Sequence, residues 1–177
     1  MNFKTRLAAS ILNSGGVVSL PTDTIQGLSC LPFEYSLRRL IELKRRSTGK
    51  GLILLSSNVN HFNDYVESPA LLKKLSVHDQ PTTYIIKASK NAPKLLMGEH
   101  DTIALRLTNN PLIQSLCELT DNPLVSSSAN ISGLNVASSA LKLRVYFQDQ
   151  LDYIIKPDTT SQQPSSIINL HTGEKLR

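Results

Sequence analysis

Residues 17–24 read Val17-Val18-Ser19-Leu20-Pro21-Thr22-Asp23-Thr24, and this stretch indicates the kind of sheet to expect. Its first half is an apolar run with the length of a short buried strand. Pro21 ends the run because proline has no N–H for a ladder bond. Two hydroxyls and a carboxylate follow at once. Because ligands of open α/β sheets bind at the carboxyl ends of strands, the stretch predicts a site there, with an ordinary polar turn as the alternative.

Helical and strand-like patterns alternate outward from this stretch. Helices are expected over residues 3–12, 34–46, 111–119 and 139–147, with a further helix start at Ser68-Pro69. Strands are expected over residues 17–20, 52–55, 82–88, 102–107, 124–126, 152–155 and 166–170. This alternation predicts an α/β or α+β layer architecture with a mixed sheet.

The composition fits one domain spanning residues 1–177. A chain of 177 residues, 40% of them hydrophobic, can bury a core without staples. Cys30 and Cys117 lie far apart, and the four histidines lack ligand spacing, so a structural zinc site is not expected. Both cysteines are expected to be small buried groups in a reducing compartment.

The N-terminus and the charge bear on location and partners. The apolar stretch after Lys4 and Arg6 is broken by residues 13–16, so neither a signal peptide nor a membrane span is expected. We expect a soluble cytoplasmic protein, and a monomer because no obligatory interface pattern is visible. The net charge of +5 suits anionic ligands such as nucleotides or RNA, but it equally suits plain solubility.

Basic residues cluster between a predicted helix and a predicted strand. Lys44-Arg45-Arg46 is followed by Lys50-Gly51. Cations there can complement the helix dipole, or they can clamp a polyphosphate or carboxylate. Arginine offers a planar fork to such an anion and lysine a point charge. Arg106, in the middle of a predicted strand, is likewise either a surface residue or part of the same site.

Hydroxyl groups crowd two further strand ends. Residues 125–133 place four hydroxyls and an amide beside a strand, and Ser165-Ser166 opens another strand. Such small polar groups can bind phosphate oxygens, whereas a Ser-rich surface loop and an ordinary strand start are the alternatives. No Walker, GxGxxG, GxSxG or HExxH motif occurs. The residues alone therefore predict an α/β domain with a cationic, hydroxyl-rich site.

In these segments the sequence resembles the YrdC/TsaC family of threonylcarbamoyl-AMP synthases, in its short single-domain bacterial form. The segments that carry the resemblance are Pro21-Thr22-Asp23-Thr24 with Gly27-Leu28 and Cys30; Glu42-Leu43-Lys44-Arg45-Arg46 with Lys50-Gly51-Leu52; Ala104-Leu105-Arg106 with Asn110-Pro111; residues 126–133; and Pro164-Ser165-Ser166-Ile167. Their common order and spacing are specific, although each alone is not. The resemblance implies a twisted mixed sheet with flanking helices around a large positively charged cavity.

The resemblance also implies an activity. Members condense L-threonine, bicarbonate and ATP to threonylcarbamoyl-adenylate and pyrophosphate, with Mg²⁺ carried on the ATP phosphates and no metal site of the protein's own. A transfer complex then places the threonylcarbamoyl group on an adenosine beside the anticodon of certain tRNAs. Direct binding of tRNA or other RNA is a further expectation.

The family's catalytic Lys-Arg-Ser-Asn tetrad falls on Lys44, Arg46, Ser128 and Asn130. By this resemblance, the two cations hold the threonine carboxylate, the carbamate and adjoining phosphate oxygens, while Ser128 and Asn130 bind the α-phosphate region. The remaining substrate and ATP contacts fall on Ser126 beside them, Thr22 and Thr24 toward the amino acid, Lys50 toward the phosphates, and Arg106 and Ser166 on the nucleotide side.

Two departures from the family pattern accompany the match. Gln26 stands where members usually have an aromatic residue, and residues 159–163 lack the expected glycines. The main alternative function is a non-catalytic module of the same fold that binds double-stranded RNA or tRNA. It is disfavoured because aromatic residues are sparse and no RNP or KH motif occurs. A hydrogenase-maturation relative and an inactive homologue are weaker alternatives.

Overall fold

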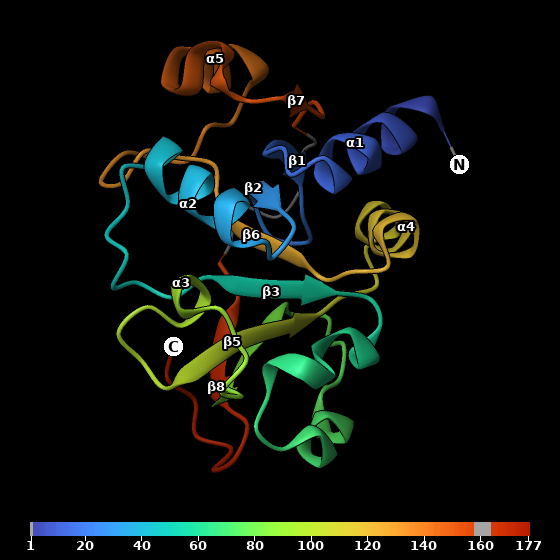
Figure 1. Cartoon of the computed structure of the whole chain (residues 1–177), viewed down its shortest axis with the longest axis vertical. Helices are drawn as coiled ribbons and strands as arrows, with labels where there is room; N and C mark the ends of the chain where they lie inside the picture. The colour runs from blue at the N-terminus through green and yellow to red at the C-terminus, as the bar shows by residue number, and fades with distance from the viewer. Residues whose placement is uncertain (1, 158–163) are drawn as a thin grey trace.

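The computed structural model describes residues 2–157 and 164–177, which form an eight-stranded sheet flanked by helices (Figure 1). The strand order is β7-β1-β2-β6-β3-β5-β4-β8. The strands are β1 Val18–Pro21, β2 Gln26–Cys30, β3 Ile53–Ser56, β4 Thr82–Lys87, β5 Thr102–Leu107, β6 Leu124–Ser128, β7 Tyr153–Ile154 and β8 Ser166–Asn169. The α-helices are α1 Phe3–Asn13, α2 Glu34–Leu43, α3 Lys94–Met97, α4 Pro111–Thr120 and α5 Ala140–Phe147. Three 3₁₀ helices span Val59–Tyr65, Pro69–Lys74 and Gln148–Gln150.

The sheet is mixed, as the sequence predicted. β3 runs parallel to β5, β4 to β8 and β1 to β7, whereas the remaining neighbours are antiparallel. None of the helices in the described residues is long and apolar enough to cross a bilayer.

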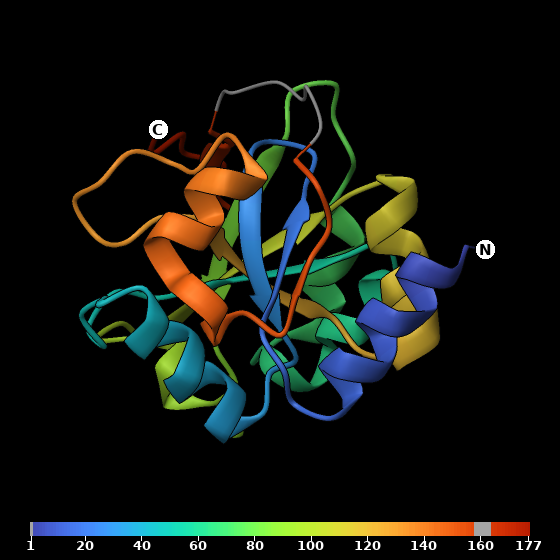
Figure 2. The same ribbon diagram turned by 90° about the horizontal axis from the view of Figure 1, so that it is seen from above.

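Each face of the sheet has its own core because successive strand residues point to opposite faces. Leu54 of β3 packs in a cluster with the apolar faces of α2 and α5, whereas Leu55 packs with α1 and α4. Viewed from above, α2 and α5 lie on one side of the strands and α1 and α4 on the other (Figure 2). Ile53 shares the face of Leu55 but lines a cavity. The α1 and α4 layer therefore covers only part of its face.

Most predicted elements are confirmed, with boundary shifts of a few residues. Both cysteines are buried and free. The sequence analysis missed β2, whose Gln26–Cys30 segment is buried throughout although it mixes polar and small residues. Ser68 precedes a 3₁₀ helix rather than an α-helix and makes no capping hydrogen bond with its side chain.

The predicted helix 34–46 is too long, because α2 ends at Leu43. Arg45 has a φ of 47°, which reverses the chain. Its N–H donates to the Glu42 carbonyl at 2.9 Å and that of Arg46 to the Ile41 carbonyl at 3.0 Å. These two bonds are the Schellman pattern, in which the left-handed position is usually glycine. The sequence shows no glycine there, so the helix end could not be read from it.

We predict that Arg45→Gly stabilises the protein. The Arg45 side chain is exposed, so the substitution mainly relieves the left-handed backbone conformation. The free energy of unfolding in urea should rise by about 0.5–1 kcal/mol. Arg45→Ala removes the same charge but keeps a Cβ and should give no gain. Equal effects of the two substitutions would contradict the backbone explanation.

Candidate functional site

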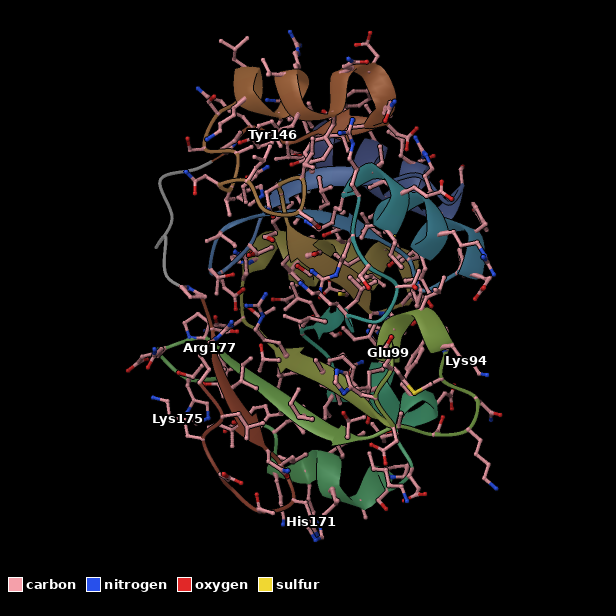
Figure 3. All side chains as sticks on the ribbon, turned by 90° about the vertical axis from the view of Figure 1, so that its left-hand side faces the viewer. Lys94, Glu99, Tyr146, His171, Lys175 and Arg177 are labelled. Atoms are coloured by element: carbon pink, nitrogen blue, oxygen red, sulfur yellow. The ribbon has the colours of Figure 1, made fainter. Side chains whose placement is uncertain are left out.

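A cavity of about 430 Å³ opens on the part of the sheet that α1 and α4 leave uncovered. Its floor comes from alternate residues of the central strands, including Ile53, Ala104 and Ser126. One end is closed by α3 and the other by the segment around Ser165. In the side view, Arg177 lies on the opposite side from Glu99, which follows α3 (Figure 3). Arg46, Arg106 and Arg177 all line the cavity.

The turn between β1 and β2 forms one wall with Arg106. The hydroxyl oxygens of Thr22 and Thr24 lie 3.0 Å apart, and Arg106 Nη1 donates to Thr24 Oγ1 at 3.2 Å. Asp23 Oδ1 lies 3.6 Å from Arg106 Nη2. Arg106 is only 3% exposed, so the surface interpretation of this residue is wrong. Burial lowers the pKa of Arg106, and the Asp23 carboxylate opposes that shift.

Lys44 is inserted behind the opposite wall, the loop that follows β6. Its Nζ donates to the Ser128 carbonyl, to the Asn130 carbonyl at 2.8 Å and to Asn130 Oδ1 at 3.2 Å. The whole residue is 1% exposed. Burial, together with the charge of Arg46, lowers the pKa of Lys44 to about 7. The ammonium therefore has all three N–H groups engaged by the loop.

Asn130 and Ser128 complete this internal network. Ser128 Oγ donates to Asn130 Oδ1 at 2.6 Å, and Asn130 Nδ2 donates to the carbonyls of Ile131 and Leu134. The Asn130 side chain is thus fully used by its own loop and by Lys44. Ser128 still lines the cavity, whereas Asn130 does not.

Arg46 reaches the cavity from the end of α2. Its Nη2 donates to the Gly51 carbonyl at 2.9 Å, and burial lowers its pKa. Within residues 2–157 and 164–177, the buried Nε atoms of Arg46 and Arg106 have no hydrogen-bond partner. A buried donor without a partner costs about 1–3 kcal/mol. The charged guanidinium groups that line the cavity would favour an oxyanion there.

The structure brings together six of the ten predicted site residues in the cavity wall, which are Thr22, Thr24, Arg46, Arg106, Ser126 and Ser128. Four predicted residues do not line it. Lys44 and Asn130 lie behind the wall. Lys50 is exposed, and Ser166 lies next to the lining residue Ser165.

The sequence analysis missed several lining residues. Ser165 contacts Thr83 through a 2.8 Å hydroxyl pair, and its carbonyl accepts from Arg177 Nη2 at 3.0 Å. His100 lines the cavity beside α3. The pair of serines at 165–166 was a usable signal, but which of the two faces the cavity depends on strand register. Nothing in the sequence pattern marked Arg177 or His100.

Gln26, the departure from the family pattern, does not line the cavity. Its Nε2 donates to Ser19 Oγ at 2.8 Å and to the Ile155 carbonyl at 3.1 Å, which ties the β1–β2 hairpin to the end of β7. The second departure, residues 159–163, lies outside the described residues.

A second hollow, of about 530 Å³, lies where the parallel strands β3 and β5 end. It is the larger of the two, but its described lining contains Glu118, Asp121 and His61 and no lysine or arginine. An anionic substrate would be repelled there. We therefore place the candidate site in the arginine-lined cavity.

Comparison with known proteins assigns the chain to a family. A family model named Sua5_yciO_yrdC, described as telomere recombination, matches residues 10–177. The chain belongs to this family. A threonylcarbamoyl-AMP synthase of Acinetobacter baumannii is 37% identical over 180 residues, which cover 96% of this chain and 95% of the relative.

Two solved structures of the Sua5/YciO/YrdC family have the same fold. P. abyssi Sua5 complexed with L-threonine superposes with a TM-score of 0.84 at 26% identity, covering 97% of this chain and 52% of that one. This chain thus spans about half of that protein. E. coli YciO superposes with a TM-score of 0.77 at 26% identity, covering 93% of this chain and 82% of the other.

We predict that Lys44 gives the protein a stability that rises with pH. Its pKa is about 7 in the folded protein and ordinarily 10.5, so between these values the unfolded chain holds more protons. Unfolding then becomes less favourable as pH rises. From pH 7 to 9, the free energy of unfolding of the wild type should rise by on the order of 2 kcal/mol relative to Lys44→Met.

Chemical denaturation of both proteins at the two pH values measures this difference, and all other titrating groups cancel. Lys44→Gln serves if the methionine variant does not fold. A difference that stays constant from pH 7 to 9 would show that Lys44 titrates at its ordinary value.

Proposed function

We propose that this protein is a threonylcarbamoyl-AMP synthase that condenses L-threonine, bicarbonate and ATP to threonylcarbamoyl-AMP and pyrophosphate. The observation that carries the proposal is a single cavity lined by Arg46 and Arg106, each with a buried donor that has no partner in the described residues. The A. baumannii relative bears this enzyme's name, and the P. abyssi Sua5 structure holds L-threonine. These findings support the enzyme over the RNA-binding module.

The cavity suits the physical problem that the reaction poses. Carbamate, carboxylate and triphosphate are anions that repel one another, and gathering them costs entropy. Fixed cations offset the repulsion, and shared binding supplies proximity. Among the described residues, the lining contains no nucleophile paired with a base. The residues therefore act by positioning and charge stabilisation, as is general for phosphoryl transfer.

We assign the direct contacts to the residues that line the cavity. Arg46 binds phosphate or carbamate oxygens, with Ser126 beside it, whereas Ser128 lines the wall but donates its hydroxyl proton to Asn130. Ser165 replaces Ser166 on the nucleotide side because it is the serine that reaches the wall. Lys44 and Asn130 act from behind by holding the loop, and Lys50 contributes charge at the rim.

The Mg²⁺ expected with ATP would enter the site bound to the substrate. The described residues contain no group of three His, Cys, Asp or Glu side chains that could hold a metal. We propose that Mg²⁺ arrives on the triphosphate and lowers its charge. We also propose a cytoplasmic monomer whose product passes to a transfer complex acting on tRNA.

The proposal predicts that pyrophosphate release from ATP requires both threonine and bicarbonate. Mass spectrometry of the products should detect threonylcarbamoyl-AMP in the complete mixture and not when either substrate is omitted. RNA binding without any turnover would favour the module instead. Turnover that proceeds without threonine would also exclude this enzyme.

We predict that Arg46→Ala lowers kcat/KM for pyrophosphate release by about 100-fold, because it removes a charged donor from the anion site. Lys4→Ala is the matched control, since Lys4 is an exposed cation on α1, and its rate should equal that of the wild type. The two proteins should unfold at similar denaturant concentrations. A normal rate for Arg46→Ala would remove Arg46 from the site.

A further inference from the structure

The hydroxyl protons of the β1–β2 turn can be assigned from their neighbours. Thr22 Oγ1 lies 2.8 Å from the Ile25 carbonyl, which can only accept, so Thr22 donates its proton there. The proton in the 3.0 Å contact between Thr22 and Thr24 then belongs to Thr24. Arg106 Nη1 donates to Thr24. The donations run in one direction, from Arg106 through both hydroxyls to the Ile25 carbonyl.

This direction leaves neither hydroxyl with a proton for a ligand. Thr22 and Thr24 are also only 1% and 3% exposed. The backbone N–H groups of Thr24 and Ile25, both 3.3 Å from Thr22 Oγ1, share its remaining lone pair. Neither hydroxyl can therefore donate to a carboxylate or phosphate oxygen while the turn keeps these bonds, so the two threonines do not bind a substrate oxyanion directly.

The same turn holds the second terminal nitrogen of the guanidinium. Asp23 Oδ1 is 3.6 Å from Arg106 Nη2, an ion pair too long for a hydrogen bond, whereas Thr24 Oγ1 accepts a hydrogen bond from Nη1. A long, flexible arginine side chain otherwise loses rotamer entropy when it binds a ligand. The hydrogen bond from Nη1 to Thr24, together with the attraction of Nη2 to the Asp23 carboxylate, orients the guanidinium before any ligand arrives.

We infer that Thr22, Asp23 and Thr24 are positioning residues that act on the reaction through Arg106, whose guanidinium they aim at a substrate oxyanion. The oxyanion is a carboxylate or a phosphate, which share this chemistry. The inference rests on the proposed function for its kinetic readout. A displacement of a substrate-binding group by about 1 Å can lower the rate about 100-fold. The orientation of the Arg106 guanidinium by this turn can therefore affect the rate strongly.

A double-mutant cycle between Thr24→Val and Arg106→Lys tests this inference. Thr24→Val should lower kcat/KM about tenfold in the wild type and less than about twofold in Arg106→Lys, because lysine has no fork to align. Thr24→Ser keeps the oxygen and should restore most of the rate. Equal losses in both backgrounds would mean that Thr24 touches substrate directly and would overturn the inference.

Binding measurements separate this inference from the proposed function. The same four proteins can be titrated calorimetrically with ATP alone and with threonine alone, which requires no turnover. We expect the losses of binding affinity from the two substitutions to be non-additive for the ligand whose oxyanion Arg106 contacts. Additive losses with both ligands would overturn the inference even in an active enzyme. If the binding losses are non-additive but the protein forms no threonylcarbamoyl-AMP, the inference about Arg106 stands and only the proposed function is rejected.

Discussion

The buried ammonium of Lys44 is the constraint on which the site depends. A lysine that is 1% exposed can keep its charge only if its N–H groups all find oxygens. The carbonyls of Ser128 and Asn130 and the Asn130 side chain supply them. The chain after β6 must therefore turn its oxygens inward, and α2 must end where Lys44 can reach them. Arg46 enters the cavity two residues later as a consequence.

Repulsion between Lys44 and Arg46, and the cost of burying Arg106, follow from the same arrangement. The charge of Arg46 contributes to the lowered pKa of Lys44, and burial lowers the pKa of Arg106 despite the Asp23 carboxylate. Such a cluster is least stable when empty, because the charges repel and the buried Nε donors have no partner in the described residues. Bound anions relieve both costs. The site therefore favours its substrates by the same physics that strains the free protein.

Sequence patterns could predict the elements that have a clear period or cap. The helix at Asn110-Pro111 is an example, because Asn110 accepts from the N–H groups of Leu112 and Ile113 as a cap should. β2 had no such signal, since its five buried residues include glycine, serine and glutamine. The end of α2 was hidden because a non-glycine residue takes the left-handed position.

The site was predictable as a set of residues but not as a geometry. Residue types and order pointed to the right segments, and six of the ten predicted side chains line one cavity. Whether Ser165 or Ser166 faces the cavity is a matter of strand register, because neighbouring residues point to opposite faces. That Lys44 supports the wall from behind follows from its three contacts with the loop, which no linear pattern contains.

The parallel pairing of β4 with β8 has a consequence for synthesis of the protein. β8 joins the sheet beside a strand made much earlier, and Ser165 and Arg177 close one end of the cavity. Until β8 has been synthesised, the cavity that Arg46 and Arg106 line has no far wall. The cavity is thus complete only after β8 has left the exit tunnel, and until then the edge of β4 remains open to wrong partners.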